Sequence, residues 1–282
     1  MSWVDFANWW FEPLSYPFMQ NALFMALIIA VICAVLSCFL ILKGWSLMGD
    51  AISHSVLPGI VLAYVASIPL AIGALVSGLL CAFGIGYLKS HSRIKEDTVM
   101  GIIFSGMFAL GLVLFSKVET EQHLSHILFG NLLGITPQEL MQTLIIAVLV
   151  FLIILLKKQD FLLFCFDPNH LRVIGLSPKK LHYSLLFLLA LTIISTMQVV
   201  GIILVTAMLI SPGITAYVLS KNFNKMLLIA IVSSTISSFL GVIISYHLDA
   251  ATAPTIILLQ ALIFLLALIY TRYSSYKKCS EQ

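Results

Sequence analysis

The sequence predicts an all-α, polytopic membrane protein with eight or nine transmembrane helices, some of them short or broken. Of its 282 residues, 61% are hydrophobic and only 10% are charged, and the mean hydropathy is +1.08. A soluble domain carries about 25% charged residues. Apolar runs recur along the whole chain, and a run of roughly 18 residues or more can cross a hydrocarbon core of ~30 Å as a helix. We therefore expect a single transmembrane domain over residues 1–282.

The expected spans lie at residues 19–42, 55–67, 69–88, 99–116, 140–157, 183–197, 202–219, 226–246 and 255–271. Two neighbouring pairs among them come from splitting longer apolar runs. The run 55–88 is too long for one crossing and breaks at Ser67-Ile68-Pro69, and the run 183–219 breaks near residues 198–201. If 55–67 is only a half-span, the total falls to eight and the side of the N-terminus is left open.

Basic residues mark the predicted cytoplasmic side. Fourteen of the fifteen Lys and Arg residues fall on one face of this topology, and only Lys117 falls on the other. Because cytoplasmic loops are enriched in Lys and Arg, the C-terminus is expected inside, and nine crossings place the N-terminus outside. The outer face collects acidic residues, namely Asp5, Glu12, Glu119, Glu121, Glu139 and Asp249. These acids either favour cations at an outer mouth or are ordinary solvated loop residues.

An aspartate and a histidine stand four residues apart in the stretch GDAISHSVLPG, residues 49–59. Lys43 marks the cytoplasmic end of the first span, so Asp50 and His54 are expected within the depth of the membrane, on a short or re-entrant helix. At this spacing their side chains share one helix face, with Cβ atoms about 5–6 Å apart. A carboxylate and an imidazole so placed can bind one divalent ion such as Mn, Fe or Zn. Pro58 is expected to free the carbonyl of His54.

The alternative for this pair is a neutral contact that holds two helices together. We favour ion handling, because an ionisable residue inside a membrane is by default a candidate functional site. Further ligands are needed to complete a coordination shell. Asp249 is one candidate, although a solvated loop residue or helix cap fits it as well, and Met208 is another, since Pro212 leaves its carbonyl without a donor. The outer loop 119–126 has an HxxH spacing and is either a metal antenna or, preferably, a solvated contact for a partner.

Residues 158–182 form the longest predicted cytoplasmic connection, and a short helix is expected within it at Phe166–Leu176. Asp167 suits the N-cap, Pro168 the first helical position and Gly175 the position after the helix end. A second helix start follows at Ser177-Pro178. The apolar residues available to dock into a partner's groove are Phe166, Leu171, Ile174 and Leu176. The alternative is a helix that lies on lipid headgroups.

Motifs for independent catalysis are missing from the sequence. It contains no G-x-x-x-x-G-K-[ST] phosphate loop, no H-E-x-x-H and no G-x-S-x-G. We therefore expect a transport subunit that is not an enzyme, with ATP hydrolysis in a partner. The five cysteines form no CxxC pair and are interpreted as packing residues. The position of the basic residues explains the net charge of +3 better than nucleic-acid binding does.

Several stretches together carry a family resemblance: residues 42–55 (LKGWSLMGDAISHS), 95–101 (KEDTVMG), 128–136 (LFGNLLGIT), 200–205 (VGIILV), 210–213 (ISPG) and 245–249 (SYHLD). Over nearly its whole length the chain resembles the membrane subunit, or permease, of ATP-binding-cassette importers that bring manganese, zinc or iron into bacteria. The resemblance implies that Asp50 and His54 handle the metal. It also implies that the predicted helix couples to the ATPase, through Phe166, Asp167, Pro168, His170, Leu171 and Gly175.

The resemblance further implies an assembly in the bacterial plasma membrane. It consists of two permease subunits, identical or related, two ATPase subunits that use ATP, and an extracytoplasmic metal-binding protein. No cofactor is bound permanently, and the metal is cargo; the wording around residues 43–54 and 245–249 favours manganese or iron over zinc. Residues 249–254 (DAATAP) depart from the glycines that many relatives carry there. The rival class is an ATP-independent cation channel or secondary metal transporter.

Overall fold

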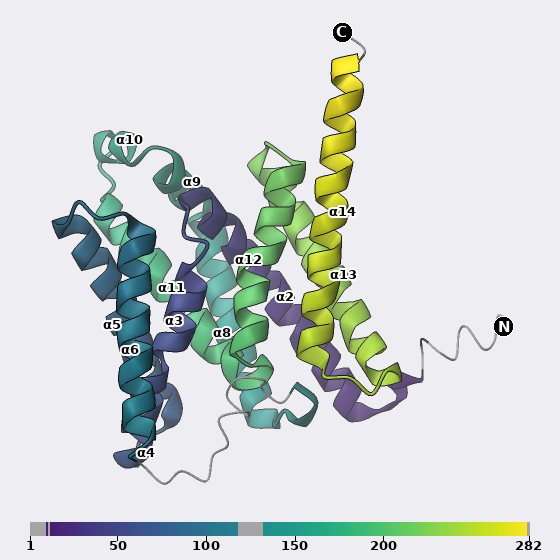
Figure 1. The fold of residues 1–282 in the computed structure, drawn as a ribbon, viewed down its shortest axis with the longest axis horizontal. Coiled ribbons are helices and arrows are strands. Elements are labelled where there is room, and N and C mark those ends of the chain that lie inside the picture. Colours follow the sequence, from purple (N-terminus) through teal and green to yellow (C-terminus); the bar gives the residue numbers. More distant parts are fainter. Residues whose placement is uncertain (1–9, 11, 118–131, 281–282) are drawn as a thin grey trace, which may run out of the picture.

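The computed structural model describes residue 10 and residues 12–117 and 132–280. Within these residues the ordered elements are all helices, with no strand (Figure 1). The sequence prediction for the outer loop 119–126 lies outside the described residues. So does part of the stretch at 128–136.

The described helices run in chain order as α2 (Pro17–Lys43), α3 (Met48–Ser55), α4 (Leu57–Val65), α5 (Leu70–His91), α6 (Glu96–Phe115), α8 (Pro137–Leu156), α9 (Lys158–Phe166), α10 (Pro168–Val173), α11 (Pro178–Val200), α12 (Ile202–Leu219), α13 (Phe223–His247) and α14 (Thr252–Ser280). Short 3-10 turns lie at Pro13–Ser15 and Leu132–Gly134. In the described part of the chain, nine helical stretches are long and apolar enough to cross a membrane, and α3 and α4 together form one of them, Met48–Val65. Nine spans, rather than eight, therefore fit the structure.

The second span differs most from its prediction. It was expected at residues 55–67 but begins at Met48, so Asp50 and His54 belong to the span itself. The reason is the sharp end of α2, where Gly44 adopts a left-handed conformation (φ 76°) that glycine tolerates at no steric cost. The last span ends at Tyr273, close to the predicted residue 271, and its polar end continues as helix to Ser280.

The helices differ in how far they are enclosed by the rest of the bundle. α2 packs against α12 and α13, which both contact α14, while α11 packs against α5 and α8. In α2, in the α3–α4 stretch and in α11, most apolar residues are buried, whereas α6 and α8 expose most of theirs. Lipid tails are as apolar as Leu, so these exposed faces suit contact with the hydrocarbon core.

Two glycines allow α4 and α5 to cross at very close range. A Cβ atom on Gly59 would overlap the carbonyl oxygen of Gly73, and a Cβ atom on Gly73 would overlap the carbonyl oxygen of Gly59. Small residues at such crossings let two membrane helices approach backbone to backbone. This crossing fixes α4, and with it the broken span that carries Asp50 and His54, against α5.

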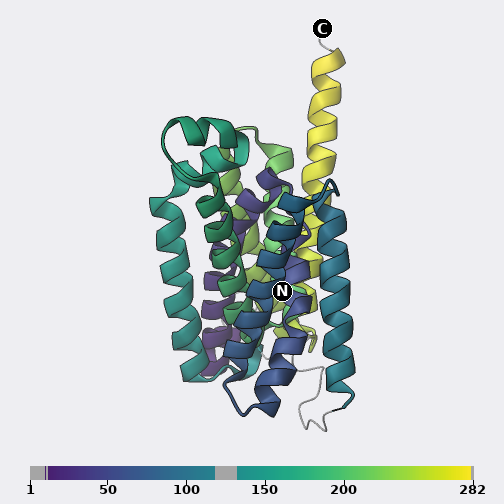
Figure 2. The same cartoon turned by 90° about the vertical axis from the view of Figure 1, so that its left-hand side faces the viewer.

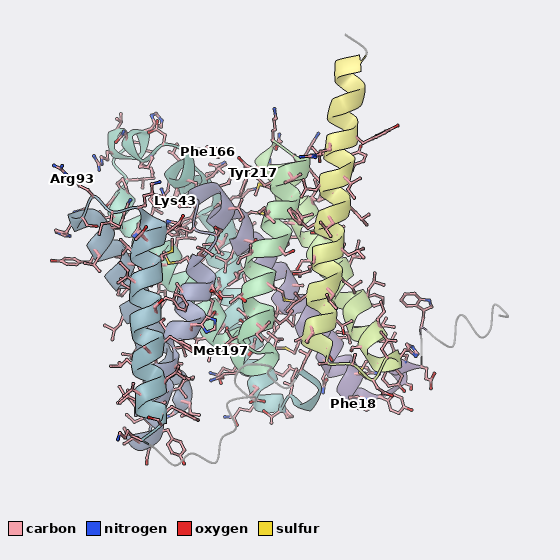
Figure 3. All side chains as sticks on the ribbon, viewed as in Figure 1. Phe18, Lys43, Arg93, Phe166, Met197 and Tyr217 are labelled. Carbon is pink, nitrogen blue, oxygen red and sulfur yellow. The ribbon has the colours of Figure 1, made fainter. Side chains whose placement is uncertain are left out.

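The two ends of the bundle carry different side chains. The end of α2, the α5–α6 turn, α9, α10, the α12–α13 turn and the C-terminus lie together at the upper end of Figure 1. Figure 3 labels Lys43 and Arg93 at this end and Phe18 at the opposite end. Figure 2 shows α14 extending beyond all other helices on the same side. Most basic residues of the described chain lie in or beside the elements of this end, and Lys117, after the far end of α6, lies at the other, as the charge pattern predicts.

Candidate metal pathway

The chain enters the interior of the bundle directly after α2. The N–H of Gly44 donates to Ile41 O (3.1 Å) and that of Trp45 to Leu40 O (2.8 Å), which closes the helix end. Trp45 is buried, and its ring meets the ring of His182 edge-on at a centroid distance of 4.9 Å. α3 then begins inside the bundle, between α6 and α12 and well below the upper end of α2 (Figure 1).

Asp50 and His54 lie on the open face of α3. The Nε2 atom of His54 is 3.5 Å from Oδ1 of Asp50, and the side chains are 25% and 39% exposed respectively. The other residues of α3 are buried. As predicted, Asp50 and His54 lie on one face of a helix, and this helix belongs to a stretch that is long and apolar enough to span a membrane.

The separation of these two atoms suits one metal ion between them. In a tetrahedral site with ligands about 2.0–2.1 Å from the metal, two adjacent ligand atoms lie roughly 3.3–3.4 Å apart. The observed 3.5 Å is close to this separation. When His54 is protonated, the same geometry is an ion pair instead, so a metal ion and a proton compete for the imidazole.

Two phenylalanines of α6 hold the ring of His54. Its centroid lies 5.6 Å from that of Phe104 and 5.3 Å from that of Phe108. The Nδ1 atom is buried, and no hydrogen-bond partner for it lies among the described residues. Aromatic walls therefore flank the ring, and its Nε2 atom faces Asp50. This leaves the imidazole available as a ligand.

The remaining polar groups of α3 are used in packing. The hydroxyl of Ser77 in α5 donates to Ser55 O (2.6 Å), and those of Ser53 and Ser55 donate back to carbonyls of α3. The predicted free carbonyl at His54 is wrong. The helix breaks at Val56, before Pro58, and the N–H of Val56, which keeps a helical conformation, turns to His54 O in place of the N–H that Pro58 lacks.

Of the two further ligands considered from sequence, Asp249 is not brought to this pair, and Met208 stays a prediction. Asp249 lies in the α13–α14 turn at the lower end of the bundle, with φ +48° (Figure 1). Met208 is fully buried in α12, whose next residue, Leu209, contacts Gly49 of α3. Across the described ranges, no group of three or more His, Cys, Asp or Glu side chains could hold a metal. One chain thus supplies a carboxylate and an imidazole.

The aromatic walls of the site were not predicted from the sequence. Phe104 and Phe108 stand four residues apart in α6, with the same spacing as Asp50 and His54 in α3. Aromatic pairs at helical spacing are common in apolar spans, so nothing in the local pattern singled these two out. Ser77 was missed for the same reason.

The predicted cytoplasmic helix is present as α10, Pro168–Val173. Oδ1 of Asp167 accepts hydrogen bonds from the N–H groups of Asn169 and His170, both at 3.0 Å, and Pro168 occupies the first helical position. Gly175 has φ +82°, and the N–H of Leu176 donates to Leu171 O (3.0 Å) across the helix end. The predicted second start at Ser177-Pro178 opens α11.

One residue of the predicted docking surface is misassigned. Leu171 is fully buried, because it is the residue with which α10 packs onto its own bundle. Phe166 and Val173 are instead 67% and 81% exposed, and Ile174 is also exposed. The apolar surface open to a partner is therefore formed by Phe166, Val173 and Ile174.

A further helix, α9, was not expected and joins α10 to the rest of the bundle. Phe161 of α9 contacts Phe39 of α2, with ring centroids 6.1 Å apart. Nζ of Lys43 donates to Phe164 O (3.4 Å) and lies 4.1 Å from the centroid of that residue's ring. Burial raises the pKa of the Cys165 thiol to about 11, opposed by the charge of Lys43. α9 is thus held at the end of α2 that leads into α3.

Similarity to known proteins agrees with this architecture. The chain is 66% identical over 265 residues to a "Probable iron transport system membrane protein" of Haemophilus influenzae, covering 94% of this chain and 98% of that protein. It is 50% identical over 264 residues to the "Manganese transport system membrane protein MntB" of Synechocystis sp., covering 94% and 86%. The solved structure of PsaBC from Streptococcus pneumoniae in complex with Fab matches with a TM-score of 0.84 and 36% identity, over 96% of this chain and 99% of that one.

A family model described as the ABC 3 transport family matches residues 15–271, which is nearly the whole described bundle. Together with the relatives above, this match identifies the chain as a member of the ABC 3 transport family.

Proposed function

We propose that this chain is the permease subunit of an ATP-driven importer that carries manganese or iron into the bacterial cytoplasm. The observation that carries the proposal is the Asp50–His54 pair, whose ligand atoms lie 3.5 Å apart on the open face of a helix within the bundle. Relatives that are named for manganese and iron transport support this choice of cargo. Zinc, which the same ligand types also bind, is the second candidate.

The proposed orientation puts the basic end of the bundle, with the C-terminus, in the cytoplasm. The excess of Lys and Arg at that end supports it. An ATPase subunit then binds at α10, and an extracytoplasmic metal-binding protein docks at the opposite end. A second permease subunit, identical or related, supplies further ligands, because the described residues of one chain bring only a carboxylate and an imidazole together.

The proposed transport cycle uses three features of the chain. The metal ion arrives from the delivery protein and is held by the ionised Asp50 and the neutral His54, since a divalent cation favours both of these forms. ATP binding in the partner moves Phe166, Val173 and Ile174, the exposed apolar surface beside and within α10. The contacts of α9 with Phe39 and Lys43 pass this movement to the end of α2, and so to α3.

The rival function, an ATP-independent cation channel or secondary transporter, is not supported by the family match. It also gives no reason for a well-capped cytoplasmic helix that keeps exposed phenylalanine, valine and isoleucine side chains. Transport by this chain in liposomes without any ATPase is the result that would favour it.

Radioactive manganese uptake tests the proposal in cells that lack their own importers and express this chain with its ATPase and delivery protein. Asp50→Asn and His54→Ala are compared with wild type and with Asp97→Asn, which replaces an exposed carboxylate in the first turn of α6. We expect uptake to collapse in the first two variants and to persist in the third, while all of them still assemble with the ATPase. Competition by excess ferrous iron or zinc identifies the preferred metal. Normal uptake by both site variants would make the pair structural.

A further inference from the structure

A groove of about 470 Å³ lies at the basic end of the bundle, away from α3. The last turns of α2 and α12 and the first turn of α13 form it, beside Phe166, the last residue of α9. Figure 3 labels two of its lining residues, Phe166 and Tyr217, at the same end as Lys43. Its volume falls in the roughly 300–1,000 Å³ range of small-molecule sites. Of its lining residues, the proposed transport cycle uses only Phe166.

The lining of the groove is divided into an apolar wall and a polar rim. Leu42, Val218 and Met226 belong to the wall, which continues the apolar surface of three membrane-spanning helices. Tyr217, Ser220 and Lys221 form the rim, where α12 ends and the chain turns into α13. A ligand that fits both parts has an apolar tail directly attached to a polar group.

The charge at the rim is positive and is not neutralised by neighbouring acids. In the part of the chain that the structure describes, Lys221 makes no ion pair. Lys158 lies close by, because its Nζ donates to Oδ1 of Asn224 (2.8 Å). Among the acids of this end, Asp160 pairs with Lys157 at 3.8 Å, Asp167 caps α10, and Asp97 belongs to α6, which does not line the groove. The rim therefore favours an anion.

We propose that this groove binds one anionic phospholipid of the cytoplasmic leaflet. Its acyl chain lies against Leu42, Val218 and Met226, and its phosphate meets Lys221 with the hydroxyls of Ser220 and Tyr217. Basic pockets between membrane helices on the cytoplasmic side bind lipid headgroups in this way. The site rests on the proposed orientation of the chain. It places a lipid against Phe166, so the lipid would support the position of α10.

A phospholipid fits this groove better than a segment of the ATPase does. The wall is formed by the ends of membrane spans, and the lysine stands where those ends meet water. An acyl chain and a phosphate lie at these two depths in any cytoplasmic leaflet. A soluble partner would have to bring an apolar segment to the depth of the membrane spans and an acidic group to their ends.

Native mass spectrometry of the purified complex tests the site with added phosphatidylglycerol or phosphatidylcholine. We expect one phosphatidylglycerol per permease chain to be retained, and phosphatidylcholine to be lost. Lys221→Gln should weaken retention about fivefold, the equivalent of one lysine–lipid interaction. Lys221→Arg should retain the lipid. Lys179→Gln, which removes an exposed lysine outside the groove, should bind like wild type. The proposal would be overturned if Lys221→Gln retained phosphatidylglycerol as well as the wild-type complex does. It would also be overturned if the wild-type complex retained both lipids equally.

A photo-crosslinking residue at Val218 in the assembled complex identifies the occupant directly. The expected product is the permease joined to phospholipid. A crosslink to the ATPase instead would assign the groove to that partner and overturn the lipid site. Neither experiment measures metal uptake, so a failed lipid site leaves the proposed transport function untouched. Failed uptake likewise leaves the lipid result interpretable.

Discussion

Nζ of Lys43 donates to the backbone carbonyl oxygen of Phe164 at 3.4 Å and lies 4.1 Å from the centroid of that residue's ring. Lys43 is the last residue of α2, five residues before Met48, the first residue of the helix that carries Asp50. Phe164 belongs to α9, which leads directly into α10. The side chain of Lys43 thus joins α2, which delivers the chain into α3, to α9, which leads into the proposed ATPase-coupling helix.

Replacing Lys43 by methionine should uncouple ATP hydrolysis from transport. The variant keeps the apolar stem of the lysine and loses only the charge, the hydrogen bond and the cation–π contact, worth about 1–2 kcal/mol in all. We expect the assembled complex to hydrolyse ATP at a near-normal rate while metal uptake per ATP falls several-fold.

Lys89→Met is the matched control for this variant. Its Nζ also donates to a backbone carbonyl at 3.4 Å, that of Ile94, but at the α5–α6 turn. Uptake per ATP should be unchanged there. Equal loss in both variants would show that the effect is general to lysines at this end of the bundle, and not a property of the link between α2 and α9.

Gly59→Ala should destabilise the crossing of α4 and α5. The added Cβ atom would overlap the carbonyl oxygen of Gly73, and backbone atoms cannot move aside as the end of a flexible side chain can. Overpacking of this kind costs typically about 1–3 kcal/mol. Thermal unfolding of the purified chain should show a lowered Tm.

Gly106→Ala in α6 is the corresponding control, because a Cβ atom there meets nothing within 4 Å. It should keep the wild-type Tm or raise it, since alanine favours a helix over glycine by about 1 kcal/mol. A Tm that is unchanged in Gly59→Ala would contradict the close approach of α4 and α5.

Asp167→Ala should weaken the binding of the ATPase by destabilising α10. The two N–H groups of Asn169 and His170 would lose their acceptor, which costs a helix about 1 kcal/mol. Asp167→Asn retains the capping oxygen and should restore binding. The affinity of the purified permease for its ATPase, measured by surface plasmon resonance in detergent, is the readout. Full affinity in the alanine variant would place the ATPase contact elsewhere.

The Cys165 thiol gives a pH dependence outside the membrane spans. Burial raises its pKa from 9.0 to about 11, with Lys43 acting in the opposite direction. Between these values the folded state binds more protons than the unfolded state, so this group's contribution to stability is present below pH 9 and is lost as the pH rises toward 11.

Alkylation by iodoacetamide checks this pKa, because the thiolate is the reactive form. Modification of Cys165 in the folded protein should be slow at pH 8 and should increase steeply above pH 10. Lys43→Met should slow it further, since a positive charge near the thiol is removed. The unfolded protein provides the control for full reactivity. Rapid modification of folded Cys165 at pH 8 would contradict the burial of this thiol.

Local signals in the sequence were enough to predict most of the fold. Hydropathy located the spans, and the cap residues Asp167 and Gly175 located α10, because span length and capping depend on neighbouring residues alone. The position of Asp50 and His54 on one face followed from the period of a helix. The early start of the second span was missed because it depends on the turn at Gly44, which lets the chain re-enter the bundle.

Contacts between distant segments could not be predicted from the sequence. The walls of the His54 site come from α6, about fifty residues further on, and their phenylalanines look like any other apolar pair. Leu171 was expected at a partner surface because its apolar character does not reveal which side of α10 faces the bundle. α9 was overlooked because its buried phenylalanines become a helix face only when packed against α2.

The direct test of the metal site is pulsed electron paramagnetic resonance of Mn²⁺ bound to the reconstituted complex, with ¹⁵N-labelled histidine in the permease alone. If Asp50 and His54 hold the ion, the spectrum contains a ¹⁵N coupling from one imidazole nitrogen of each permease chain that binds. This coupling should disappear in His54→Gln. It should persist in His91→Gln, which replaces an exposed histidine at the end of α5. An unchanged nitrogen coupling in His54→Gln would contradict the assignment of His54 as a metal ligand.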